Sequence, residues 1–162
     1  VVAVVAAALA ALYQQLFAMG IILLLYHTPW APIHIYEPVG MIGMLLLSWF
    51  SGAAIGLIFY AAKPWQPEVV GILSTIYQRA NMIASGKMFV ASMLPSSRRA
   101  LFDWNPLFHT IDQARGHMFL NYHPRFTSVE YPIKVALVCI MIGLMAEFYT
   151  RRHASASWLK RT

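Results

Sequence analysis

Long apolar runs constrain the fold of this chain more than any other feature. Four segments are dominated by apolar side chains over lengths that can cross a bilayer: residues 1–26, 39–62, 68–90 and 132–150. Lipid offers no hydrogen-bond partners to the backbone, so segments that cross it over this length must be helical. The sequence therefore predicts an all-α, polytopic membrane protein with four transmembrane helices in a single membrane domain.

Composition and charge agree with a membrane location. The chain is 59% hydrophobic and only 11% charged, which is far from the composition of a soluble domain. Its formal net charge of +6 fits the orientation of membrane helices and contact with anionic lipid better than binding of nucleic acid. The single cysteine, Cys139, lies inside an apolar run, so one chain cannot form a disulfide framework or a cysteine metal site. We expect a multi-pass protein whose partners include membrane lipids and exclude nucleic acid.

Small and polar residues within the runs indicate faces that contact protein or water. Ser48, Gly52 and Gly56 stand four apart, a stripe that lets another helix approach closely. Arg79 lies within the third run, and an arginine at membrane depth faces a bundle interior or an aqueous path. For Arg79 we therefore weigh a role in a pathway or subunit interface against a structural ion pair.

The connection between the third and fourth runs is polar and broken by prolines. Asn105 is a favourable helix cap, and Pro106 at the first helical position loses no needed N–H. Apolar residues then recur at helical spacing, with the polar residues His109, Asp112, Gln113 and Arg115 on the other side. The sequence predicts a short amphipathic helix over 105–120 that is interfacial or re-entrant at the outer surface. We expect the Asn105 side chain to accept a hydrogen bond from the N–H of residue 107 or 108.

Basic residues give two conflicting indications of orientation. Four of them follow the last run within residues 151–162, and their density favours a cytoplasmic tail: Arg151, Arg152, Lys160 and Arg161. Six more lie from Lys87 to Lys134, so charge alone leaves the orientation open. The chain starts at Val1 inside an apolar run and lacks the basic region and cleavage site of a signal peptide. We therefore expect that an N-terminal part of a longer protein precedes it.

Motifs of enzymatic chemistry are absent from the sequence. It has no phosphate-binding glycine loop, no G-x-S-x-G, no H-E-x-x-H and no histidine–cysteine set with metal spacing. The chain therefore does not bind ATP through a P-loop of its own. We expect no catalytic residues, no cofactor and no metal site.

The order of motifs near the polar connection resembles a known family. SGKMF, then MLP, then NPLFHTIDQAR is similar to the last third of the membrane subunits of ABC-type polysaccharide exporters, the type-2 permeases. The resemblance covers residues 39–152. The positions that carry it are Ser85, Gly86, Phe89, Leu94, Pro95, Asn105, Pro106 and Arg115.

This resemblance implies a function and partners. The protein would be a homodimeric permease in the bacterial inner membrane, driven by a separate ATP-binding cassette subunit. It would export a glycan such as capsule or O-antigen, and four of its six spans would lie in this chain. Candidate substrate contacts are Tyr77, Arg79, Phe89, Trp104 and Arg115. The aromatic members are equally compatible with a plain role at the membrane interface.

An accessory subunit, packed against a larger membrane complex without transporting anything, is the alternative function. The histidine and methionine content of the chain is compatible with that alternative. Upstream sequence would discriminate the two, because two further spans and an amphipathic helix would support the exporter.

Overall fold

The computed structural model describes residues 2–26 and 35–158, with side chains up to His153. Across these residues the chain forms helices and no strands, which confirms the all-α prediction. The main helices are α1 (Val2–Tyr26), α2 (Pro38–Ala62), α3 (Pro67–Ala84), α5 (Pro106–Met118) and α6 (Glu130–Trp158). Between α3 and α5 lie a 3₁₀ turn, η1 (Ala91–Met93), and the short α4 (Ser96–Arg99).

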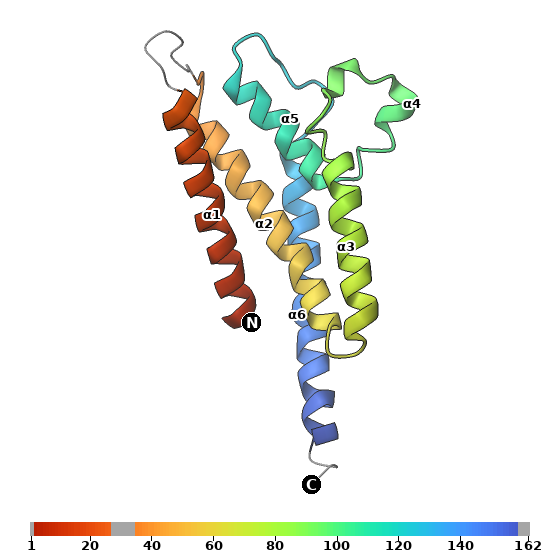
Figure 1. Ribbon diagram of the computed structural model, residues 1–162. Coiled ribbons are helices and arrows are strands. Elements are labelled where there is room, and N and C mark those ends of the chain that lie inside the picture. Colours follow the sequence, from red (N-terminus) through yellow and green to blue (C-terminus); the bar gives the residue numbers. More distant parts are fainter. Residues whose placement is uncertain (1, 27–34, 159–162) are drawn as a thin grey trace.

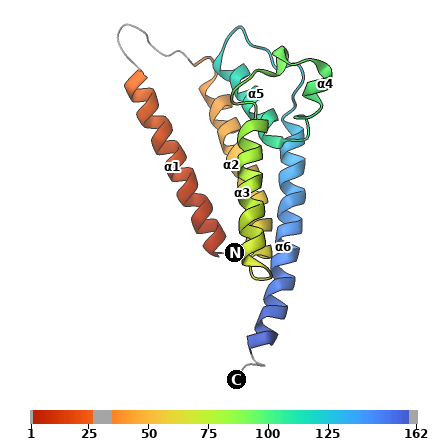
Figure 2. The ribbon, with the colours of Figure 1, turned by 45° about the vertical axis from the view of Figure 1, so that its right-hand side comes forward.

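The long helices run back and forth between two ends of a bundle (Figure 1, Figure 2). Residues 85–129, which we call the outer segment, contain η1, α4 and α5 and lie at the end where α1 and α3 finish. We name this the outer end, and the opposite one, where α2 turns into α3, the inner end. At the inner end α6 extends past the other helices (Figure 1).

Within the described part of the chain, three helices are long and apolar enough to cross a membrane: α1, α2 and residues Glu130–His153 of α6. The prediction of four spans is therefore not confirmed, because α3 does not meet that description. It has only 18 residues, and Glu68 and Arg79 are among the polar side chains that lower its hydropathy. The third helix also ends at Ala84 rather than at residue 90, since Gly86 has a positive φ of 73° that stops helical geometry.

The last helix is longer than predicted. We expected it to end at residue 150, where the apolar run gives way to arginines, but α6 continues to Trp158. Arg151 is held to the preceding turn by two hydrogen bonds to Glu147 Oε1, from Nε at 3.1 Å and Nη2 at 2.8 Å. Arginine and alanine are good helix formers, so the end of the apolar run does not end the helix.

Helix α2 lies at the centre of the bundle, and two helices pack against it, one along each half. α5 runs antiparallel to its first half, where Ser48 Oγ donates to Thr110 Oγ1 at 2.7 Å. α6 packs along its second half, where Thr150 Oγ1 donates to the Ala61 carbonyl at 3.1 Å and Gly143 lies against Leu57. The small residues Ala54, Ala61 and Ala136 are buried and allow this close approach.

The predicted small-residue stripe on α2 divides into two parts. Ser48 contacts α5 through its hydroxyl. Gly52 and Gly56 are exposed, and a methyl group added to either would meet no atom within 4 Å. Their packing role therefore stays a prediction, and it concerns a helix outside this chain.

Candidate functional site

The start of α5 is fixed by Asn105. Its side-chain oxygen accepts the N–H of Leu107 at 2.9 Å, which confirms the predicted cap. Its amide also donates to Asn81 Oδ1 on α3 at 2.7 Å. Asn105 is only 1% exposed, so the start of α5 is anchored inside the protein against the last turn of α3.

α5 does not lie flat at a surface. Its residues Phe108, His109, Thr110 and Asp112 are buried. Its C-terminal end reaches the start of α2, where the His117 carbonyl accepts the N–H of Glu37 at 2.8 Å and His117 Nδ1 contacts Glu37 Oε2 at 2.7 Å. From there to the Ser48–Thr110 bond, α5 follows about 15 Å of α2. This geometry fits a re-entrant helix better than an interfacial one, and the membrane placement of α5 stays a prediction.

Arg115 joins α5 to the backbone that follows α3. Its guanidinium donates to the Gly86 carbonyl at 2.7 Å and to the Phe89 carbonyl at 2.8 Å. Arg115 stands three residues after Asp112 but forms no ion pair with it, because Asp112 accepts hydrogen bonds from Tyr122 and Thr127. Three backbone carbonyls of the bend, including Lys87 at 3.3 Å, thus gain a charged donor.

Glycine is required at position 86. The positive φ disfavours any other residue, and an added methyl carbon would lie 2.8 Å from the Phe108 ring. Ser85, beside it, is buried and donates from Oγ to the Met82 carbonyl at 3.1 Å. The residues that resemble the exporter family, from Ser85 and Gly86 to Asn105, Pro106 and Arg115, therefore meet at one junction between α3 and α5. Pro95 lies apart from it, exposed before α4.

Aromatic rings fill the interior of the outer segment. The Phe89 ring lies 4.9 Å from that of Phe102 and 6.3 Å from that of Phe108, centroid to centroid. Phe89 and Arg115, two of the predicted substrate contacts, are therefore turned toward the protein's own atoms. Both shape the outer segment from inside.

A buried polar network fastens the rest of the outer segment to α5. Asp112 is 1% exposed, and its carboxylate accepts the hydroxyls of Tyr122 and, at 2.9 Å, Thr127. Gln113 Nε2 donates to the Thr127 carbonyl at 2.8 Å. The bond to Asp112, together with burial, raises the pKa of Tyr122 to about 12. Burial is the larger cause.

His109 completes this network. Its Nδ1 accepts the N–H of Ser128 at 3.1 Å, so the ring proton is on Nε2, which donates to the Asp103 carbonyl at 2.8 Å. Sequence reasoning placed His109 and Asp112 on the polar side of α5 without giving them a role. Their position on a helix between two membrane runs was the signal that could have revealed this role. Polar side chains within a membrane usually form hydrogen bonds with protein partners.

The other predicted contacts lie at or near the surface. Trp104, 56% exposed, donates its indole N–H to the Leu101 carbonyl and accepts the Tyr131 hydroxyl at its own carbonyl, at 2.8 Å. Tyr77 is half-buried, with its ring 5.7 Å from that of Phe59 on α2. Arg79 is exposed and has no ion-pair partner among the described residues. The structural ion pair considered for it is therefore not formed within this part of the chain.

Comparison with known proteins identifies relatives. No family model matches the chain. It is 28% identical over 148 residues to a polysialic acid transport protein, KpsM, of Escherichia coli, and 27% identical to a second protein of that name and organism. Each match covers 89% of this chain and 56% of the relative, so the chain spans about half the length of the curated relatives it matches. The resemblance read from the motifs is confirmed at the level of relatives: the chain is distantly similar to polysialic acid transport proteins.

Proposed function

We propose that this chain is part of the transmembrane subunit of an ABC transporter that exports a polysaccharide across the inner membrane of a bacterium. The junction between α3 and α5 carries the proposal, because Gly86, Asn105 and Arg115, which resemble the exporter family, make the hydrogen bonds that join the two helices there. The similarity to a polysialic acid transport protein supports a glycan polymer as substrate. A capsule polymer and an O-antigen are both compatible with it.

The exposed face of α3 supports a path for such a polymer. Thr75, Gln78 and Arg79 follow one another at helical spacing and are all exposed, so they form a polar strip. Beside it runs an apolar strip that contains Ile72, Ile76 and Ile83, also exposed. In the assembled protein, α3 would also cross the membrane, as the fifth of six spans, with its apolar strip toward lipid and its polar strip toward an aqueous path.

Arg79 is the residue that requires such a path. An unpaired arginine in contact with lipid is costly, so its guanidinium must meet water, substrate or another protein surface. Just outward of it, the Asn81–Asn105 bond places α3 beside the foot of α5, next to the exposed Trp104. Arg79, Tyr77 and Trp104 are therefore our proposed glycan contacts. Arginine at this position favours an anionic polymer, and aromatic rings offer flat faces to the C–H groups of sugars.

The partners follow from this function. A separate ATP-binding cassette subunit would supply energy, because the sequence has no P-loop. A second copy of the subunit would close the path opposite α3. The outer segment would then face away from the cytoplasm and the basic end of α6 toward it, in agreement with the density of arginines after residue 150.

An export assay in a strain that depends on the full-length protein tests the proposal. Arg79→Gln should lower export about tenfold or more, the loss of one charged contact, while Arg79→Lys retains most of it. Arg98→Gln, at an exposed arginine of the outer segment, is the matched control and should export normally. Purification in mild detergent should also yield an ATP-binding subunit. Normal export by Arg79→Gln, or a stable complex without an ATP-binding subunit, would favour the accessory subunit instead.

A further inference from the structure

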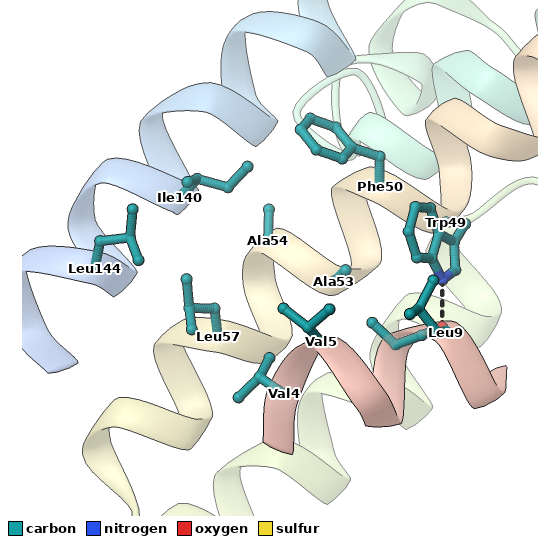
Figure 3. Close-up of a pocket in the computed structure, with 11 residues that line it drawn as sticks. Val4, Val5, Leu9, Trp49, Phe50, Ala53, Ala54, Leu57, Ile140 and Leu144 are labelled. Carbon is teal, nitrogen blue, oxygen red and sulfur yellow. Dashed lines mark hydrogen bonds between the residues drawn. The ribbon is translucent and has the colours of Figure 1, made fainter. Parts of the chain in front are cut away.

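An apolar groove lies between α1, α2 and α6, within the length over which all three could cross a membrane (Figure 3). Its volume is about 240 Å³. Val5 of α1, Leu57 of α2 and Leu144 of α6 contribute to its walls. The indole N–H of Trp49, at its edge, is already bonded to the Ala8 carbonyl at 2.7 Å (Figure 3). A space with such walls gives water no partners, so whatever fills it must be apolar.

A second pocket continues this groove toward the inner end. Its volume is about 250 Å³, and its walls include Lys63, Thr150 and Arg151. On α2, Leu57 of the groove is followed one turn later by Ala61 of the pocket, about 6 Å along the axis. On α6, Leu144 is followed by Glu147, about 4.5 Å along. The two spaces therefore succeed each other along the same side of the α2–α6 contact.

The pocket lies at the level of a membrane surface and is cationic overall. Trp65 and Tyr149 stack with their rings 6.0 Å apart at the same level of the bundle, and such aromatic residues gather at the headgroup level. Glu147 contributes a carboxylate, but Arg151 pairs with it at 2.8 Å and neutralises it. Lys63 is exposed and has no ion-pair partner among the described residues, so its ammonium supplies the net charge.

We infer that this seam binds one anionic membrane phospholipid, with an acyl chain in the apolar groove and the phosphate beside Lys63 and Arg151. The apolar groove and the cationic pocket together define the ligand. A hydrocarbon would use only the groove and a free phosphate only the pocket, whereas a phospholipid uses both. The charge complementarity commits the site to an anionic headgroup rather than a zwitterionic one. The lipid would fill the space beside α1, a helix with no buried residue of its own. This inference does not depend on the transport function.

Native mass spectrometry of the full-length protein, delipidated in mild detergent, tests the site. Phosphatidylglycerol and phosphatidylcholine with identical acyl chains are titrated in parallel, and the affinity of the first bound lipid is measured. Phosphatidylglycerol should bind about fivefold more tightly, and Lys63→Gln should remove that preference. Lys134→Gln is the control, an exposed lysine at the outer end of α6. Equal affinity of the two lipids for the wild-type protein, or equal effects of the two lysine variants, would overturn the inference.

A second pair of variants tests the groove itself. Val5→Trp places an indole in the groove and should weaken binding of both lipids, while Val2→Trp, one turn away on α1 and outside the groove, should leave it unchanged. Neither side chain is buried, so both variants keep the bundle intact. If the two variants bind phosphatidylglycerol equally, the acyl chain does not occupy this groove and the assignment is wrong.

Discussion

The outer and inner halves of the molecule are held together by different forces. In the outer half, the buried residues include Asn105, His109, Thr110 and Asp112, each fixed by directional hydrogen bonds. In the inner half, the contact between α2 and α6 consists largely of small and apolar side chains such as Ala54, Leu57 and Ala61. Hydrogen bonds position the outer segment, because its interrupted helices leave polar backbone groups that need partners. Close packing suffices for continuous helices, and it leaves grooves that lipid can fill.

Asp112→Ala should show the largest effect of any single change in the outer half. It removes the carboxylate that accepts the hydroxyls of Tyr122 and Thr127, both of them partly buried. We expect a loss of about 3 kcal/mol in the free energy of unfolding, measured on the full-length protein in detergent. Asp103→Ala, at an exposed carboxylate nearby, is the control and should change stability little. Equal stability of the two variants would mean that the network does not hold the outer segment.

Gly86→Ala should have the next largest effect, a loss of about 2 kcal/mol in the free energy of unfolding. The backbone at Gly86 has a φ of 73°, and the added methyl carbon would lie 2.8 Å from the Phe108 ring. Thermal unfolding measures the loss. Gly71→Ala on α3 is the matched control, because nothing lies within 4 Å of its added carbon and alanine favours the helix. A Gly86→Ala variant as stable as Gly71→Ala would show that the bend after α3 is not a fixed feature.

Gly143→Ala carries the comparison into the inner half. Its added methyl carbon would lie 2.8 Å from Leu57 Cγ, so α6 and α2 would have to separate or Leu57 would have to change rotamer. We expect a loss of about 1 kcal/mol, smaller than at Gly86 because a flexible side chain can yield. In a double-mutant cycle, Gly143→Ala should cost less in the Leu57→Ala background than in the wild-type background, because the clashing side chain is gone. An equal cost in both backgrounds would place the strain elsewhere than in this contact.

Asn105 separates two contributions to the outer half. Asn105→Ala loses both the cap on Leu107 and the bond to Asn81, and should cost about 1 kcal/mol or more. Asn105→Ser restores a cap oxygen but is too short to reach Asn81, so its stability should fall between those of the other two proteins. If serine matches asparagine, the contact with α3 adds nothing, and the cap alone accounts for the residue.

Sequence patterns predicted the elements whose limits are set locally. The starts of α2 and α5 agree with prediction to within a residue, because Pro38, and Asn105 with Pro106, determine helix starts by their own chemistry. The end of α3 was missed, because the bend at Gly86 that stops the helix is held by Arg115, which binds carbonyls 26 to 29 residues away. The inward-facing polar side of α5 was missed for a related reason. The sequence of a polar helix face does not reveal whether water or a loop, such as residues 119–129, covers that face.

The smallest effect we expect is a pH dependence confined to the outer half. The Tyr122 phenol donates to Asp112, and burial with that bond raises its pKa from 10.0 to about 12. The folded protein therefore keeps this proton more tightly than the unfolded chain does. Its contribution to stability is complete below pH 10 and decreases as the pH rises from 10 to 12, where the unfolded chain has lost the proton and the folded protein has not.

Tyr122→Phe tests this linkage, because phenylalanine has no proton to lose. The stability of the variant should be lower than that of the wild-type protein near neutral pH, and the difference should narrow between pH 10 and 12. Unfolding curves of both proteins, recorded across that range, supply the measurement. Other tyrosines titrate in both proteins and cancel in the difference, and Tyr36→Phe, at an exposed tyrosine, is the control. A difference that stays constant up to pH 12 would show that Tyr122 does not hold its proton through Asp112.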